Sequence, residues 1–167
     1  MKHIQGAVPH PRRFDMRAVV QIVAFLTLNL SAASVCASSP DNKVPDPDSI
    51  AALEARANQA EPREQCFLYA QLVQQMTELS IHQYASGDVD KATTLLKHIQ
   101  QIAQKIHLSL ADNDKRLKSA EILLSHTAFR LNEMLHATSF EDRPLVEQTL
   151  SQVTQAKDAT MMQVFQK

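Results

Sequence analysis

A helical pattern of apolar residues runs through the middle of the chain, from Val89 to Leu135. The apolar positions recur at intervals of three and four, as on a helix with one buried face. They are Val89, Ala92, Leu95, Leu96, Ile99, Ile102, Ala103, Ile106 and Leu110, then Leu117, Ala120, Leu124, Ala128, Leu131, Met134 and Leu135. At about 100° per residue the two sets stay in phase, so the pattern predicts one buried stripe along the segment.

Shorter helical patterns lie on both sides of this segment. A short helix is expected from Ile50 to about Ala60, with Asp48 or Ser49 as its cap. A last helix, over about 143–165, carries fewer apolar residues than the other long ones. Glycine occurs twice in the chain and strand-forming runs are missing, so the sequence predicts an all-α fold.

A tight connection is expected just before the central stripe. Pro62 suits the first turn of a helix that runs to Ser86. Gly87 should end that helix in a left-handed conformation, and Asp88 should cap the next one. A link this short makes the two helices antiparallel neighbours.

The segment Ala111-Asp112-Asn113-Asp114 decides between two architectures. Its three polar residues favour caps and turns over helix interiors. With a turn there, followed by a helix over about 115–137, residues 48–167 form an antiparallel bundle of four long helices plus a short leading helix. The alternative is one long helix over 89–138 with flanking helices packed along it, which the unbroken stripe favours. Because the stripe is wide enough for a bundle interior, we expect the turn.

The N-terminus has the pattern of a secretory signal peptide. The nearly apolar run 18–30 follows Arg12, Arg13 and Arg17, and Val35 and Ala37 form a small-residue cleavage site. The run is short for a membrane span, which needs about 20 apolar residues. We therefore expect residues 1–37 to be a cleaved signal, residues 38–47 to be a disordered tether, and the mature protein to be periplasmic or extracellular. The membrane is then involved only through the signal.

Charge and cysteine usage narrow the classes of function. Cleavage would remove four of 17 basic and one of 18 acidic residues, so the formal net charge falls from −1 to about −4. The basic cluster Lys115-Arg116-Lys118 is offset by neighbouring aspartates, and no nucleic-acid partner is expected. Cys36 leaves with the signal, so Cys66 has no intramolecular partner. It is expected to be a buried apolar residue, and the alternative is a disulfide with Cys66 of a second chain.

A metal site is the sharpest chemical hypothesis. Glu133 and His136 have the Glu-x-x-His spacing of di-iron bundles, and Glu78 and His82 lie four residues apart on another predicted helix. On a helical wheel, however, all four point away from the apolar faces. We therefore expect no metal or other cofactor, and no catalytic residue stands out.

The remaining candidates have structural interpretations. His98 and His107 lie at the edges of the stripe, where a histidine packs its ring and leaves a nitrogen in water. His126, Arg130 and Glu133 form a polar ridge that is either a salt-bridged surface or a docking site. Four methionines are expected to fill gaps in the core: Met76, Met134, Met161 and Met162.

Several blocks resemble a family of small secreted all-helical bacterial proteins. They are Cys66–Val73, Met76–Glu78, Arg116–Ile122 and Glu141–Pro144. The resemblance implies export and a helical fold, and it implies no activity or site. We therefore expect a non-enzymatic exported bundle that acts through helix-face contacts with itself or a protein partner. The alternative is a bundle that binds a metal or small ligand.

Overall fold

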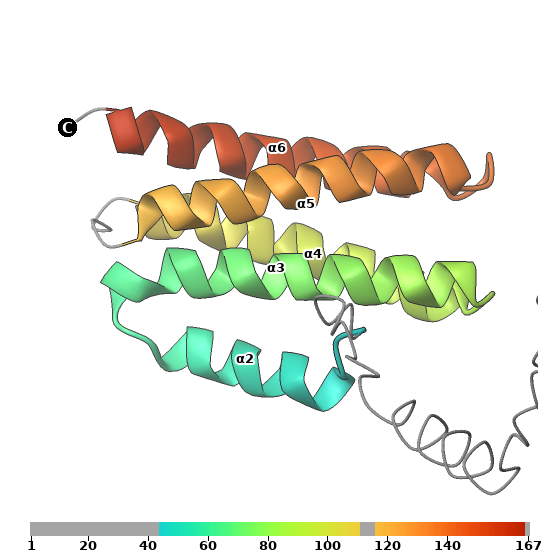
Figure 1. The fold of residues 1–167 in the computed structure, drawn as a ribbon, viewed down its shortest axis with the longest axis horizontal. Coiled ribbons are helices and arrows are strands. Elements are labelled where there is room, and N and C mark those ends of the chain that lie inside the picture. Colours follow the sequence, from blue (N-terminus) through green and yellow to red (C-terminus); the bar gives the residue numbers. More distant parts are fainter. Residues whose placement is uncertain (1–43, 111–115, 166–167) are drawn as a thin grey trace, which may run out of the picture. The chain divides into compact units, whose positions relative to one another are not determined.

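A computed structural model describes residues 44–110 and 116–165, which form five helices (Figure 1). They are α2 (Pro47–Gln59), α3 (Pro62–Ala85), α4 (Val89–Ser109), α5 (Leu117–Ala137) and α6 (Arg143–Phe165). The predicted all-α bundle of four long helices and a short leading helix is confirmed. The predicted signal peptide, most of the tether and residues 111–115 lie outside the described residues.

The four long helices form two antiparallel hairpins, α3–α4 and α5–α6, that pack side by side. Helix α3 lies against α5 and α4 lies against α6, while α4 and α5 occupy opposite corners (Figure 1). Gln74 contacts His126 and Glu78 contacts Arg130, and both pairs are 52 residues apart in sequence. A constant separation means that α3 and α5 run in the same direction. One continuous helix over 89–138 is therefore excluded.

The hairpin α3–α4 closes as predicted, at Gly87. Its φ of 85° is left-handed, and the amides of Gly87 and Asp88 donate to the carbonyls of Tyr84 (3.0 Å) and Gln83 (2.8 Å). This pair of bonds satisfies carbonyls at the end of α3 that have no partner within the helix.

Two predicted helix starts and one predicted capping bond need correction. Helix α2 begins at Pro47 with Asp46 at its N-cap, instead of with Asp48 or Ser49, because proline fits the first helical position. Asp88 does occupy the N-cap of α4, but its carboxylate pairs with Lys91 Nζ (3.0 Å) and makes no capping bond. Helix α5 begins at Leu117, after a left-handed Arg116.

Helix α3 is the most buried element of the described chain. It contacts α2, α4 and α5, and 11 of its 24 residues are buried, against six each in α4 and α5. Leu72, Val73 and Met76 are fully buried. The described part of the stripe over 89–135 is confirmed as a buried face, with Leu124 and Leu131 fully covered, but α3 has more buried residues than either helix that carries the stripe.

Polar contacts fix both ends of α5 onto α3. The guanidinium of Arg116 lies 3.4 Å from the centroid of the Phe67 ring. At the other end the Tyr84 hydroxyl accepts a hydrogen bond from the Ser139 amide (2.7 Å) and donates one to Asp142 Oδ2 (3.3 Å). These contacts hold the two hairpins in register.

Candidate binding surface

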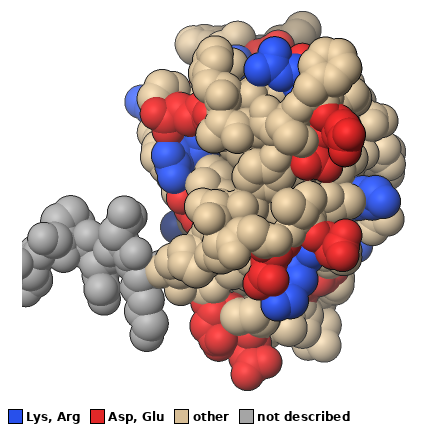
Figure 2. Space-filling model, turned by 90° about the vertical axis from the view of Figure 1, so that its right-hand side faces the viewer, with Lys and Arg blue, Asp and Glu red and all other residues tan. Residues whose placement is uncertain are grey.

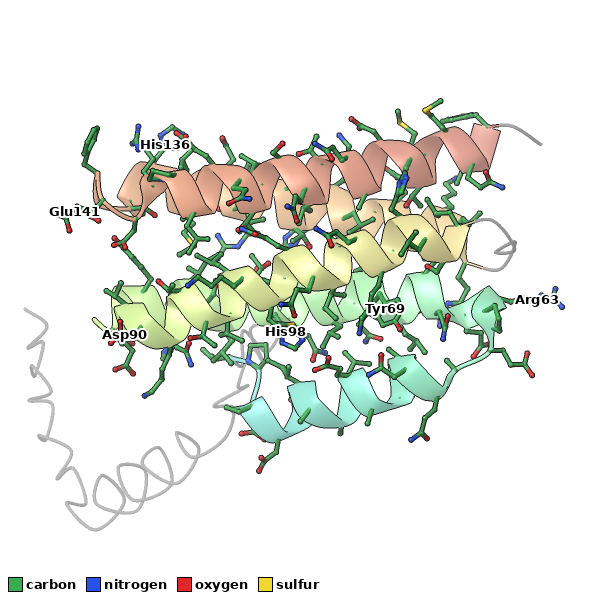
Figure 3. The ribbon with its side chains drawn as sticks, turned by 180° about the vertical axis from the view of Figure 1, so that it is seen from behind. Arg63, Tyr69, Asp90, His98, His136 and Glu141 are labelled. Atoms are coloured by element: carbon green, nitrogen blue, oxygen red, sulfur yellow. The ribbon has the colours of Figure 1, made fainter. Side chains whose placement is uncertain are left out.

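The four residues of the metal hypothesis form no metal-binding cluster among the described residues. Glu133 and His136 are exposed on α5 and His82 is exposed on α3, as the wheels predict. His136 lies on the outer side of the bundle near its end (Figure 3). Among residues 44–110 and 116–165, no three His, Cys, Asp or Glu side chains are placed to hold a metal ion.

Glu78 is half-buried because it pairs with Arg130 across the α3–α5 boundary. The guanidinium donates from Nε to Oε1 (2.9 Å) and from Nη2 to Oε2 (3.0 Å), and it also pairs with Glu133. The hydrogen bonds to Glu78 raise the pKa of Arg130 further above its ordinary value. The ridge of His126, Arg130 and Glu133 is thus a clamp between two helices of the same chain.

The short helix α2 is attached by polar contacts as well as by its buried residues Ile50, Leu53 and Ala57. His98 Nε2 lies 3.0 Å from Glu54 Oε1, and the Tyr69 hydroxyl donates to Asn58 (3.1 Å). Figure 3 shows Tyr69 and His98 on the side of the bundle that faces α2. The predicted half-buried position of His98 is therefore explained by an intramolecular partner.

A groove of about 680 Å³ lies between the parallel helices α4 and α6, which we call the α4–α6 groove. Helix α4 contributes Ala103, Gln104, His107 and Leu108, and α6 contributes Gln152, Gln155, Ala156, Asp158, Ala159 and Met162. Ala103 and Ala156 are almost fully buried, so short side chains form its floor. The groove exists because alanines leave the space between the two helices unfilled.

The rim of the groove carries apolar side chains that water reaches. Leu108 is 80% exposed and Met162 is 59% exposed, and both lie near the ends of their helices. The prediction that Met161 and Met162 fill the core is wrong, although Met76 and Met134 are buried as expected. His107, predicted at the edge of the stripe, is exposed and lines the same groove.

The polar residues of the groove are mainly uncharged glutamines. Gln104 and Gln155 are exposed, and Gln152 Oε1 is buried without a hydrogen-bond partner. Just beyond the groove Gln100 donates to Thr149 Oγ1 (2.8 Å) between the two helices. The carboxylate of Asp158 lies 3.1 Å from Lys157 Nζ, so its charge is neutralised locally. A buried acceptor without a partner is uncommon, and this one is covered by protein atoms instead of being open to the groove.

A second apolar patch lies on α5, where Ile122 and Phe129 are 57% and 59% exposed. Seven residues separate them, so they share one side of the helix. Helix α5 also carries the clamp of Arg130, which contacts Glu78 and Glu133. A partner there would remove water from charged groups, which makes this patch a weaker docking surface than the α4–α6 groove.

The end of the bundle that carries the two hairpin turns offers no patch of single charge. Figure 2 shows acidic and basic side chains interspersed with uncharged residues over this face. This face therefore shows no concentrated basic patch of the kind that nucleic acid requires.

No protein-family model, curated protein or solved structure matches this chain. The resemblance to small secreted bacterial proteins stays a prediction. Within the described part of the chain, no helix is long and apolar enough to span a membrane.

Proposed function

We propose that this chain is an exported, non-enzymatic binding protein whose α4–α6 groove docks another protein. The observation that carries the proposal is the combination of exposed Leu108 and Met162 with a floor of small buried residues. Large exposed apolar side chains beside a furrow are typical of protein-binding surfaces. The chemistry of the groove supports binding and provides no nucleophile with an activating base.

The proposed docking surface is tested by site-specific photo-crosslinking in the cell that makes the protein. A photoreactive phenylalanine analogue at Gln104 should yield a protein adduct, because that position is exposed on the groove. The same analogue at Asn132, exposed on α5, is the matched control and should yield none. Equal adducts at both positions, or none at Gln104, would contradict the proposal.

Export is tested on the same material by sequencing its N-terminus. Cleavage after Ala37 gives a mature chain that begins at Ser38. A retained leader, or a lipid on Cys36, would show that the chain reaches its compartment by another route.

A second candidate function is the binding of a small uncharged ligand in the same groove. The mostly uncharged lining over a floor of small apolar residues favours it. Volumes of about 300–1,000 Å³ are usual for ligand pockets, and this groove falls within that range.

An uncharged apolar dye such as Nile red distinguishes this candidate. The fluorescence of the dye should rise with the wild-type protein and should not rise with Ala159→Leu, which fills the groove. Asn132→Leu adds the same side chain to an exposed position on α5 and should leave dye binding unchanged. Loss of binding in both variants would rule out a specific site.

A further inference from the structure

We infer that the partner docked on the α4–α6 groove is a second copy of this chain, so that the protein forms a two-fold dimer. The inference rests on the proposed function, because it names the occupant of the same groove. Three properties support it: the charge of the groove, the area of the α4–α6 face, and the position of the exposed apolar residues. Each property fits a surface that contacts its own copy.

The lack of net charge on the groove is the first argument. In a two-fold dimer a surface meets its own copy, so a charged surface repels itself while a neutral one does not. Gln104 and Gln155 each carry a donor and an acceptor, so glutamines of two copies satisfy one another. Asp158, the carboxylate among the described groove residues, is neutralised by Lys157 of the same helix.

The size of the surface is the second argument. Helices α4 and α6 have 21 and 23 residues, so each is about 30 Å long at about 1.5 Å per residue. Side by side, with diameters of about 10 Å, they present about 600 Å² in projection. A standard interface buries roughly 800 Å² of accessible surface per partner, and accessible area exceeds projected area. The surface is therefore large enough for a stable dimer.

The position of the apolar residues sets the direction of the two-fold axis. Leu108 and Met162 lie near the same end of the parallel pair, since α4 and α6 both end there. If the axis runs along the helices, these side chains meet those of the other copy and leave water together. An axis perpendicular to the helices would instead place them over the opposite end of the partner's helices. The parallel axis buries more apolar surface and is the arrangement we infer.

Sedimentation velocity of the purified mature protein over a wide concentration range tests the inference. The wild-type protein should be a dimer, and Met162→Glu should weaken it by at least about tenfold, because the interface would bury two unpaired carboxylates. Phe129→Glu is the matched control, since Phe129 has the same exposed fraction of 59% and lies on α5. Circular dichroism should show both variants folded.

Variants of opposite charge give a second test, because restored pairing between them cannot result from a folding defect. The double variants Gln104→Lys with Gln155→Lys, and Gln104→Glu with Gln155→Glu, should each be monomeric alone because like charges meet. Mixed together, they should form a heterodimer whose affinity falls with added salt.

Three results would overturn the inference. They are a monomeric wild-type protein at its highest soluble concentration, a dimer that survives Met162→Glu, and charge variants that do not pair. A monomer that still gives an adduct from Gln104 to another protein in cells would leave the proposed function standing. Absence of that adduct would remove the proposed function itself.

Discussion

At the residue scale, burial follows the apolar pattern closely within the core and departs from it at the surface. Leu124, Leu131 and Ile99 are fully buried, as their central place in the stripe requires. Met161 and Met162 are apolar but exposed, because they lie near the end of α6, where no described element covers them. Hydrophobicity alone therefore predicted the core and missed the exposed rim of the groove.

Leu124 tests the core directly. Replacing it by alanine removes a fully buried side chain beside Ala120, so the free energy of unfolding should fall by about 2–5 kcal/mol. Urea denaturation measures this loss. Ile122→Ala, two residues away and 57% exposed, is the control and should stay within about 0.5 kcal/mol of wild type. Similar effects at both positions would mean that the stripe does not face a core.

Cys66 is buried so deeply that it should not pair with a second chain. Its side chain is 0% exposed, and burial raises the pKa of its thiol from 9.0 to about 11, despite a hydrogen bond with Thr160 that lowers it. The native thiol should resist alkylating reagents and react once urea unfolds the chain. Rapid labelling of the native protein would contradict this.

The same thiol should make stability depend on pH. The unfolded chain loses the proton near pH 9 while the folded protein keeps it to about pH 11. The contribution of the buried neutral thiol to the free energy of unfolding is therefore complete below pH 9 and is lost as the pH rises toward 11. Relative to Cys66→Ala, the wild-type protein should lose about 1 kcal/mol between pH 8 and pH 10. A parallel decline in both proteins would show that other groups cause it.

At the element scale, helix boundaries were predictable wherever glycine or proline marks them. Pro62 opens α3, because proline fixes φ near the helical value, and Gly87 closes it, because glycine takes a positive φ without steric cost. The start of α5 was missed by two residues, since Arg116 takes a left-handed φ of 66° that its sequence does not favour. Its stacking on Phe67, a tertiary contact, accompanies that conformation.

Gly87 tests how much a single turn contributes. A Cβ at this position would meet no atom within 4 Å, so a substitution costs only the strain of a positive φ. Gly87→Ala should lower the free energy of unfolding by about 1 kcal/mol, and Gly87→Asn by less, because asparagine tolerates this conformation. Thermal or urea unfolding gives the order wild type, Asn, Ala. Equal stability of all three would indicate that the turn relaxes.

At the scale of the whole molecule, the pairing of parallel helices could not be read from the sequence. The short link at Gly87 predicts that α3 neighbours α4, and this prediction holds; α5 and α6 also pack against each other. The contact of α3 with α5 depends on pairs such as Glu78 with Arg130, which are 52 residues apart and carry no local signal. The α4–α6 groove is a consequence of this pairing, so the candidate surface was equally hidden.

The distance between Asp90 and His136 tests the whole arrangement. In a continuous helix over 89–138, 46 residues would separate them by about 70 Å at 1.5 Å per residue. In the bundle both lie at the end that carries the hairpin turns, as Figure 3 shows. Both side chains are exposed, so cysteines and spin labels can replace them in a Cys36→Ser, Cys66→Ser background. We expect an electron–electron distance below about 35 Å, since two or three helix diameters of about 10 Å span the bundle. In the inferred dimer, labels on the two copies add distances of their own. Dilution with unlabelled protein removes these, so that the distance between the two labels of one chain is measured. A dominant distance near 70 Å under that dilution would show that the chain runs straight through residues 111–114.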